Sequence, residues 1–174
     1  LTTCFICVVE VEGKPALVPA CAARAEAGIF GLLRPGDHAI STTVEHNSVL
    51  RPLYHLRREG VDVDLVPFDG AGFVDPSEIR KRFRPNTRLV IVNHASNVIG
   101  TVQPIAAIGP LCREAGIPFA VDASQSAGKV PVDMEAQNID VVAFTGLADA
   151  RSVRDRHVPL GARRVAARRR GQPR

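Results

Sequence analysis

Short apolar runs recur along the middle of the chain, each separated from the next by polar residues or a helical pattern. These runs predict strands at 38–43, 61–66, 89–92, 117–121 and 139–144. The second run alternates apolar and polar residues, as a half-buried strand does. The third is apolar without interruption, which is typical of a strand buried on both faces of a parallel sheet. His38, which begins the first run, is expected to be an ordinary surface residue.

Three segments between these runs predict helices. Residues 47–59 place apolar side chains three and four positions apart, and Pro52 lies early enough for the helix to tolerate it. The second helix begins near Asp75, which can cap it, with Glu78 placed to complete a capping box. The third covers residues 104–115. Strands that alternate with helices predict an α/β fold, with a doubly wound, mostly parallel sheet and helices on both of its faces.

Polar clusters follow four of the apolar runs, at the point where each predicted strand ends. The clusters are residues 43–47, 93–97, 121–125 and 144–146. The carboxyl ends of parallel strands lie along one edge of a sheet, and ligands of open α/β sheets bind at that edge. The sequence therefore predicts one ligand site to which all four clusters contribute.

The side chains of these clusters suit a flat, phosphorylated ring. Asp122 can hold a cationic ring nitrogen with a charge-assisted hydrogen bond, and Asn97 and Gln125 can donate to a ring oxygen. His46 offers a flat face for stacking, and Thr145 offers a hydroxyl group for a phosphate. Pyridoxal 5'-phosphate would use all five groups.

The same residues also have structural explanations. Asp122 could cap the turn that follows its strand, and Asn97 could be a turn residue. His46 could mark the start of a helix, and Gln125 could be a loop amide with its hydrogen bonds satisfied. His94 is interpreted as structural, neither an acid nor a base in a reaction.

Four segments carry a family resemblance: residues 45–52, 94–101, 121–128 and 140–146. In order and in spacing they resemble the cysteine desulfurases of the class V aminotransferase family, which are pyridoxal-phosphate-dependent enzymes of fold type I. The resemblance runs from about Gly31 to Gly146 and covers only part of the cofactor domain of a family member.

The resemblance implies a reaction and a role for each matching residue. Family members are homodimers that remove sulfur from L-cysteine, leaving alanine and an enzyme persulfide. His46 would be the catalytic residue, stacking on the pyridine ring and assisting proton transfer. Asp122 would keep the ring nitrogen protonated, Asn97 and Gln125 would contact the phenolic oxygen, and Thr145 would contact the phosphate. A related class V aminotransferase or lyase activity is the nearest enzymatic alternative.

The chain departs from the family pattern after its last predicted strand. Family members continue Thr-Gly with His-Lys, and that lysine forms the Schiff base with the cofactor, but here Leu147 and Ala148 follow. No lysine occurs after Lys129. The resemblance therefore predicts a truncated, inactive relative without the Schiff-base lysine or the C-terminal domain.

With suitable codons and one base skipped, residues 151–159 resemble a Gly-Pro-x-Gly-x-Gly segment of the family. This similarity predicts a frameshift near codon 147, which the nucleotide sequence would test.

The positive charge of the chain lies in its last segment. Residues 147–174 carry nine Arg and two Asp, a net charge of +7, whereas residues 1–146 carry −3, which gives the total of +4. A basic tail could bind nucleic acid, but this one has no aromatic residue to stack on bases, and the predicted domain is acidic. A non-catalytic protein that binds the cofactor or a partner subunit is a further alternative.

The cysteines and the hydropathy exclude other classes of protein. Cys4 and Cys7 lie two residues apart, but Cys21 and Cys112 stand alone, so no zinc-binding set of four is expected. The cysteines are interpreted as small buried hydrophobic residues in a reducing cytoplasm. No apolar run reaches the roughly 20 residues that span a membrane.

The chain divides into three predicted parts. Residues 1–30 form an irregular N-terminal segment that matches the family poorly, and residues 31–146 form a partial large domain that binds pyridoxal phosphate. Residues 147–174 form an Arg-rich tail that is disordered or frameshifted.

Overall fold

The computed structural model describes residues 8–9, 18–19, 32–143, 153–154 and 165–167. Thr145 and most of the two predicted end segments, 1–30 and 147–174, lie outside the described residues. The described residues therefore cover most of the predicted domain, residues 31–146.

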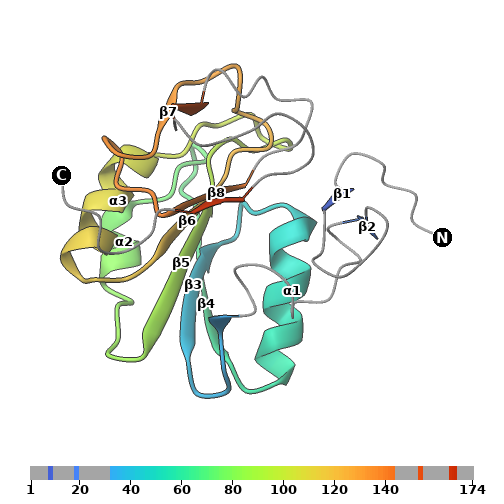
Figure 1. Ribbon diagram of the computed structural model, residues 1–174, viewed down its shortest axis with the longest axis vertical. Coiled ribbons are helices and arrows are strands. Elements are labelled where there is room, and N and C mark those ends of the chain that lie inside the picture. The colour runs from blue at the N-terminus through green and yellow to red at the C-terminus, as the bar shows by residue number, and fades with distance from the viewer. Residues whose placement is uncertain (1–7, 10–17, 20–31, 144–152, 155–164, 168–174) are drawn as a thin grey trace.

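A six-stranded sheet forms the middle of the molecule (Figure 1). Its strands are β3 (His38–Thr42), β4 (Asp62–Val66), β5 (Thr87–Asn93), β6 (Phe119–Asp122), β8 (Val141–Ala143) and β10 (Val165–Ala167). Across the sheet the order is β10-β8-β6-β5-β3-β4. β4, β3, β5, β6 and β8 run parallel, and β10 pairs with β8 antiparallel. The predicted mostly parallel sheet is confirmed.

Two short strand pairs accompany the main sheet. β1 (Val8–Val9) pairs with β2 (Val18–Pro19) antiparallel. β7 (Val132–Asp133) pairs with β9 (Val153–Arg154) parallel.

Three helices connect the parallel strands: α1 (Asn47–Arg58), α2 (Pro76–Arg80) and α3 (Ile105–Glu114). α1 continues through Pro52. Asp75 caps α2 as predicted, because its Oδ1 accepts a hydrogen bond from the Ser77 backbone N–H at 2.8 Å. The carboxylate of Glu78, expected to complete a capping box, instead pairs with Lys81 and Arg82, which directly follow the helix.

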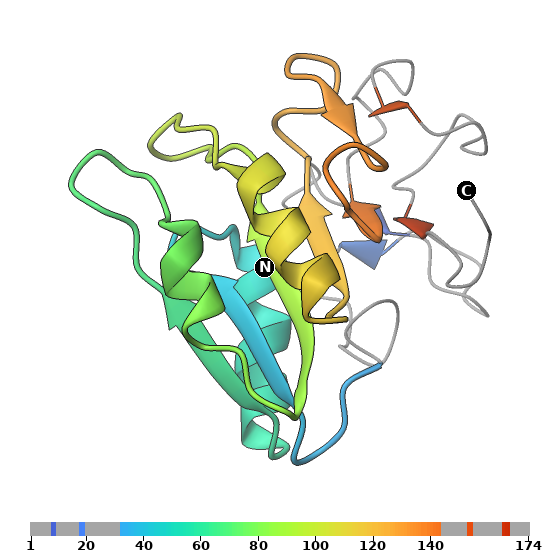
Figure 2. The same cartoon turned by 90° about the vertical axis from the view of Figure 1, so that its left-hand side faces the viewer.

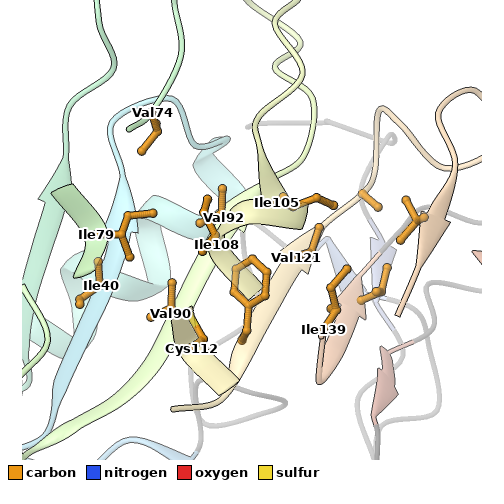
Figure 3. Packing of buried hydrophobic residues seen from close by; sticks show 14 of the residues in the cluster. Ile40, Val74, Ile79, Val90, Val92, Ile105, Ile108, Cys112, Val121 and Ile139 are labelled. Atoms are coloured by element: carbon orange, nitrogen blue, oxygen red, sulfur yellow. The ribbon is translucent and has the colours of Figure 1, made fainter. Parts of the chain in front are cut away.

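The helices lie on both faces of the sheet, as predicted, with α1 on one face and α2 and α3 on the other (Figures 1 and 2). Alternating residues of the strands supply the two cores: Ile91 of β5 packs in the cluster with α1, and Val90 packs in the cluster with α2 and α3. Figure 3 shows the second cluster, in which Ile79 of α2 and Ile108 of α3 meet the strands. Its free thiol, Cys112, is fully buried, and burial raises its pKa to about 12, so it acts as a small hydrophobic residue, as predicted.

The chain changes direction across the sheet between β3 and β5. From β3 it moves outward through α1 to β4, and then returns past β3 to β5 and on to β6 and β8. β3 and β5 are therefore neighbours whose following segments leave toward opposite sides. Their carboxyl ends form the topological switch point at which open α/β sheets bind ligands.

The interpretation of His38 as a surface residue is wrong. The side chain is fully buried at the amino-end edge of the sheet, where its Nδ1 lies 2.9 Å from Thr87 Oγ1 and its Nε2 lies 3.2 Å from Asp64 Oδ2. Arg84 pairs with Asp62 and Asp64 and closes this network from outside. Burial, together with the charge of Arg84, lowers the pKa of His38 despite the opposing effect of Asp64. His38 thus joins three adjacent strands.

Candidate functional site

Polar residues gather at the carboxyl ends of β3, β5 and β6, the edge that the sequence predicted. The three strands are neighbours, and Asn93, the last residue of β5, pairs in register with Asp122, the last residue of β6. Thr42 ends β3 on the other side of β5. The ends of three predicted clusters therefore lie side by side.

Asp122 is a buried carboxylate at this edge, with 5% of its surface exposed. Its Oδ1 accepts a hydrogen bond from the Ser124 backbone N–H at 2.9 Å. Its other oxygen, Oδ2, has no hydrogen-bond partner among the residues that the structure describes. The proposed capping of the turn is thus present, and it uses only one of the two oxygens.

Glu45 is a residue that sequence reasoning did not single out, although it lies within the first cluster. Its side chain is 8% exposed, and its Oε1 accepts two hydrogen bonds, from Thr42 Oγ1 at 2.6 Å and from the Asn93 backbone N–H at 2.8 Å. Its Oε2 is buried without a partner among the described residues. The only signal in the sequence was a charged residue inside a mostly apolar and β-branched stretch.

The environment of Glu45 favours its neutral form. Burial raises the pKa of this carboxyl group to about 8, and the charge of Asp122 adds to the effect, against the lowering effect of the two hydrogen bonds. The neutral form of Glu45 is therefore the main one at neutral pH.

His46 follows Glu45 directly and begins α1. It is the N-cap residue, and its Nδ1 accepts a hydrogen bond from the Ser48 backbone N–H at 3.2 Å and lies 2.9 Å from Ser48 Oγ. The ring is half-buried. The structural explanation for His46 is thus present, and the acceptor role fixes the orientation of a ring that remains partly open to solvent.

His94 links the ends of β5 and β6. Its ring is buried, and its Nδ1 lies 2.8 Å from Ser126 Oγ in the turn after β6. Burial lowers its pKa, so the ring is neutral at pH 7. These contacts support the interpretation of His94 as structural.

Asn97 lies on an exposed turn, residues 97–99, and hydrogen bonds from Ser96 before it and Gln103 after it fix the ends of this turn. Ser96 Oγ accepts hydrogen bonds from the backbone N–H groups of Val98 and Ile99, at 3.2 and 3.3 Å. The buried side chain of Gln103 ties the base of this loop to the loop after β4: its Oε1 accepts from Val74 N at 2.9 Å, and its Nε2 donates to Gly72 O at 2.9 Å. The Asn97 turn is therefore anchored at its base.

The side-chain amides of Asn97 and Gln125 are both exposed and form no hydrogen bond with any residue that the structure describes. Gln125 lies in the turn after β6, between Ser124 and Ser126. Thr145 lies outside the described residues. The structure thus places Asp122 at the end of β6 and His46 after the end of β3, with β5 between the two strands, and it places Asn97 and Gln125 in the turns after β5 and β6.

Neither a metal-binding cluster nor a membrane-spanning helix occurs among the described residues. No three of their His, Cys, Asp and Glu side chains are grouped so that they could hold a metal ion. None of the helices in that part of the chain is both long and apolar enough to cross a membrane.

The comparisons with known proteins agree with this geometry. The family model described as aminotransferase class-V matches residues 18–147. The chain belongs to the class-V aminotransferase family. The match ends at Leu147, the residue at which the expected His-Lys pair is replaced.

The curated relatives are cysteine desulfurases. The chain is 43% identical over 112 residues to the cysteine desulfurase IscS of Vibrio campbellii, which covers 64% of this chain and 28% of the relative. It is 42% identical over 110 residues to IscS of Anaeromyxobacter sp. strain K, covering 63% of this chain and 27% of the relative. The chain thus spans just over a quarter of the length of these relatives.

Solved structures show the same similarity. SspA in complex with cysteine superposes with a TM-score of 0.61 at 38% identity, covering 63% of this chain and 32% of that chain. An apo cysteine desulfurase from Thermococcus onnurineus superposes with a TM-score of 0.62 at 31% identity, covering 68% and 30%. The predicted resemblance to the cysteine desulfurases of the class V family is therefore confirmed.

Proposed function

We propose that this chain carries the cofactor edge of a cysteine desulfurase-like protein, that it binds pyridoxal 5'-phosphate reversibly, and that it does not turn over cysteine. One observation carries the proposal: Asp122 is a buried carboxylate beside the switch point whose Oδ1 is fixed by a backbone N–H and whose Oδ2 has no partner among the described residues. A protonated ring nitrogen would give this open oxygen a charge-assisted hydrogen bond.

The other residues of the edge fit the rest of the ring. His46 is partly exposed and held by its own helix cap, so its face is available for stacking without loss of side-chain freedom on binding. The exposed amides of Asn97 and Gln125 have donors available for the phenolic oxygen. Thr145 is proposed for the phosphate on the sequence pattern alone. When bound, pyridoxal phosphate supplies an electron-withdrawing ring that stabilises negative charge on an amino acid substrate.

The residues after Gly146 argue against catalysis by this chain. A lysine at the expected position would bond covalently to the cofactor, but Leu147 and Ala148 stand there. Lys14, Lys81 and Lys129 are the lysines of the chain, and Lys81 is paired with Glu78 on α2. We therefore propose non-covalent binding. L-cysteine as the substrate, from the names of the cysteine desulfurases above, and a homodimer as the assembly, from the family resemblance, are proposed only for a relative that has the lysine.

The test is absorption spectroscopy of the purified chain with stoichiometric pyridoxal 5'-phosphate, before and after borohydride. Reversible binding that dialysis removes, with no stoichiometric adduct after reduction, is the expected result. A stoichiometric adduct that mass spectrometry maps to one lysine would contradict the loss of covalent attachment. Retention of DNA that depends on salt, without any cofactor binding, would favour the nucleic-acid alternative instead.

Asp122→Asn gives the sharper form of this test. The variant keeps an oxygen for the Ser124 N–H but removes the charge, so the affinity for pyridoxal 5'-phosphate is expected to fall about tenfold or more. Glu114→Gln is the matched control, because it makes the same change of charge at an exposed position on α3. Equal affinities for the two variants would overturn the role of Asp122.

A further inference from the structure

We propose that Glu45 is a positioning residue of this site and that it works as a neutral acid, joining the ends of β3 and β5 while Asp122 alone supplies the charge that faces the ring nitrogen. The proposal rests on the proposed binding of pyridoxal phosphate and adds a residue to which neither the sequence pattern nor the comparisons assign a role.

The hydrogen bonds of Glu45 place it at the switch point. Thr42 Oγ1 donates to its Oε1 from the end of β3, and the Asn93 backbone N–H donates to the same atom from the end of β5. The side-chain amide of Asn93 also donates to Val44 O at 3.4 Å. One carboxyl group therefore joins the two strands whose carboxyl ends border the ligand edge.

The position of Glu45 in the chain makes this junction relevant to the ligand. His46, the next residue, is the ring proposed to stack on the cofactor, and Asn93 pairs in register with Asp122. The Glu45 carboxyl group thus belongs to the residue before His46 and bonds to Asn93, the residue of β5 that pairs with Asp122. These are the two groups that must face the same ring from different elements.

The charge state of Glu45 decides whether the junction holds. In the neutral form no charge is buried, and Oε1 still joins Thr42 of β3 to the backbone of Asn93 of β5. Ionisation would leave an unpaired charge on a buried oxygen without a partner among the described residues, next to a second carboxylate. Water would then have to enter the edge, and the relative positions of His46 and Asp122 would be lost.

The groups that act on Glu45 can be named for each neighbouring element. Asp122 at the end of β6 is the charged group that acts on Glu45, and its negative charge opposes the ionisation of Glu45. Thr42 and Asn93, from β3 and β5, are uncharged donors. His46 and His94 are the titratable rings at the same edge, and the pKa of His94 is lowered by burial.

The first measurement needs no ligand. In the full 174-residue chain labelled with ¹³C at glutamate carboxyl groups, the resonance that is lost in Glu45→Gln is expected to titrate near pH 8. The Asn93 amide and the His46 ring are expected to show a transition with the same midpoint in the wild type and none in Glu45→Gln. Thr42→Val removes a bond that favours the ionised form, so it should move the midpoint upward. A carboxyl group that titrates below pH 6, or neighbours that do not follow it, would overturn the proposal.

The second measurement is the affinity for pyridoxal 5'-phosphate at pH 7 and pH 9. Since only the neutral fraction of Glu45 is competent, the wild-type affinity is expected to fall about tenfold more than that of Glu45→Gln between these values. The comparison with Glu45→Gln cancels the titration of the cofactor itself. Glu45→Ala, which loses both hydrogen bonds, should bind weakly at both values.

The outcomes separate the two proposals. If no variant binds the cofactor, the proposed function fails, and the ligand-free titration alone decides the role of Glu45. If the wild type binds but Glu45→Gln behaves like Glu45→Ala at pH 7, the carboxyl group is needed in its charged form and the neutral-acid proposal is wrong. If the wild type and Glu45→Gln change in parallel with pH, the proposal is also wrong.

Discussion

At the amino ends of the strands, buried His38 has Thr87 on one ring nitrogen. Its other ring nitrogen forms no hydrogen bond with a described residue, but it lies 3.2 Å from the Asp64 carboxylate, whose charge Arg84 balances. At the carboxyl ends, Glu45 and Asp122 are also buried, but each keeps one oxygen without a partner among the described residues. The two edges belong to the same sheet and bury similar chemical groups.

The difference between these two edges separates polar groups that stabilise the fold from polar groups that await a ligand. At the amino-end edge the fold itself supplies the charged neighbour of the buried ring, whereas Glu45 Oε2 and Asp122 Oδ2 have no partner among the described residues, so a ligand could supply one. We therefore assign the amino-end edge to the fold and propose the carboxyl-end edge as the ligand site. Substitutions at the two edges should accordingly differ in what they change.

The largest expected effect is a gain of stability at the carboxyl-end edge. Because the pKa of Glu45 is raised from 4.5 to about 8, the folded chain binds more protons than the unfolded chain between these values, and its stability falls as pH rises through this window. Glu45→Gln has no group that titrates at this position, so it does not show this loss. The difference in unfolding free energy between Glu45→Gln and the wild type is expected to be roughly 2–4 kcal/mol larger at pH 9 than at pH 5, in favour of the variant. Urea unfolding at both values measures the difference. Glu114→Gln, on the surface of α3, should run parallel to the wild type.

The next effect is a loss of stability at the amino-end edge. Thr87→Val removes the partner of His38 Nδ1 and the acceptor of the Arg84 backbone N–H, at 2.9 and 2.8 Å. Leaving buried polar groups without partners is expected to cost about 1–3 kcal/mol in unfolding free energy. The affinity for pyridoxal 5'-phosphate should not change. Thr43→Val, at an exposed threonine, is the control for stability, and a Thr87→Val chain as stable as this control would contradict the comparison.

A smaller effect is expected from the titration of His38. Its pKa is lowered, so below pH 6.5 the unfolded chain binds more protons than the folded chain, and stability falls as pH decreases through this range. Glu45 acts in the opposite sense over the same range, so the measurement belongs in the Glu45→Gln background. There, adding His38→Gln should flatten the dependence of the urea midpoint between pH 7 and pH 5. The slope that remains is assigned to His94, whose pKa is also lowered.

The smallest effect is expected at the exposed part of the amino-end edge. Arg84 pairs with Asp62 and Asp64 where solvent reaches all three side chains, and exposed ion pairs contribute little. Arg84→Gln should lower the urea midpoint less than Thr87→Val does, and 1 M NaCl should reduce the difference from the wild type further. A loss that is larger than that of Thr87→Val, or insensitive to salt, would show that the network is not a surface feature.

Much of the fold could be read from local patterns. The predicted helix at 104–115 is α3 (Ile105–Glu114), and the apolar run 89–92 is the centre of β5, which is buried on both faces. These elements follow from periodicity and from Gly, Pro and capping residues, which act within a few positions along the chain. The order of the strands in the sheet does not follow from local patterns, because parallel pairing joins segments that a helix separates along the chain.

The candidate site divides in the same way. Asp122 was found because a polar residue directly follows an apolar strand, and the structure places it at the expected edge. The sequence could not indicate the burial of His38, because it begins its strand and its neighbours Thr87 and Asp64 come from other strands, which a helix or more separates from it along the chain. The contacts of Glu45 could not be predicted for a related reason, because its second donor, Asn93, lies 48 residues away.

By itself, the sequence determined the class of this protein: alternating strands and helices, four polar clusters in family order, and Leu147 where the family has its His-Lys pair. Only the tertiary structure decided which polar groups are paired. Burial and the approach of neighbouring strands set the protonation of Glu45 and His38, and neither effect is a property of the residue type.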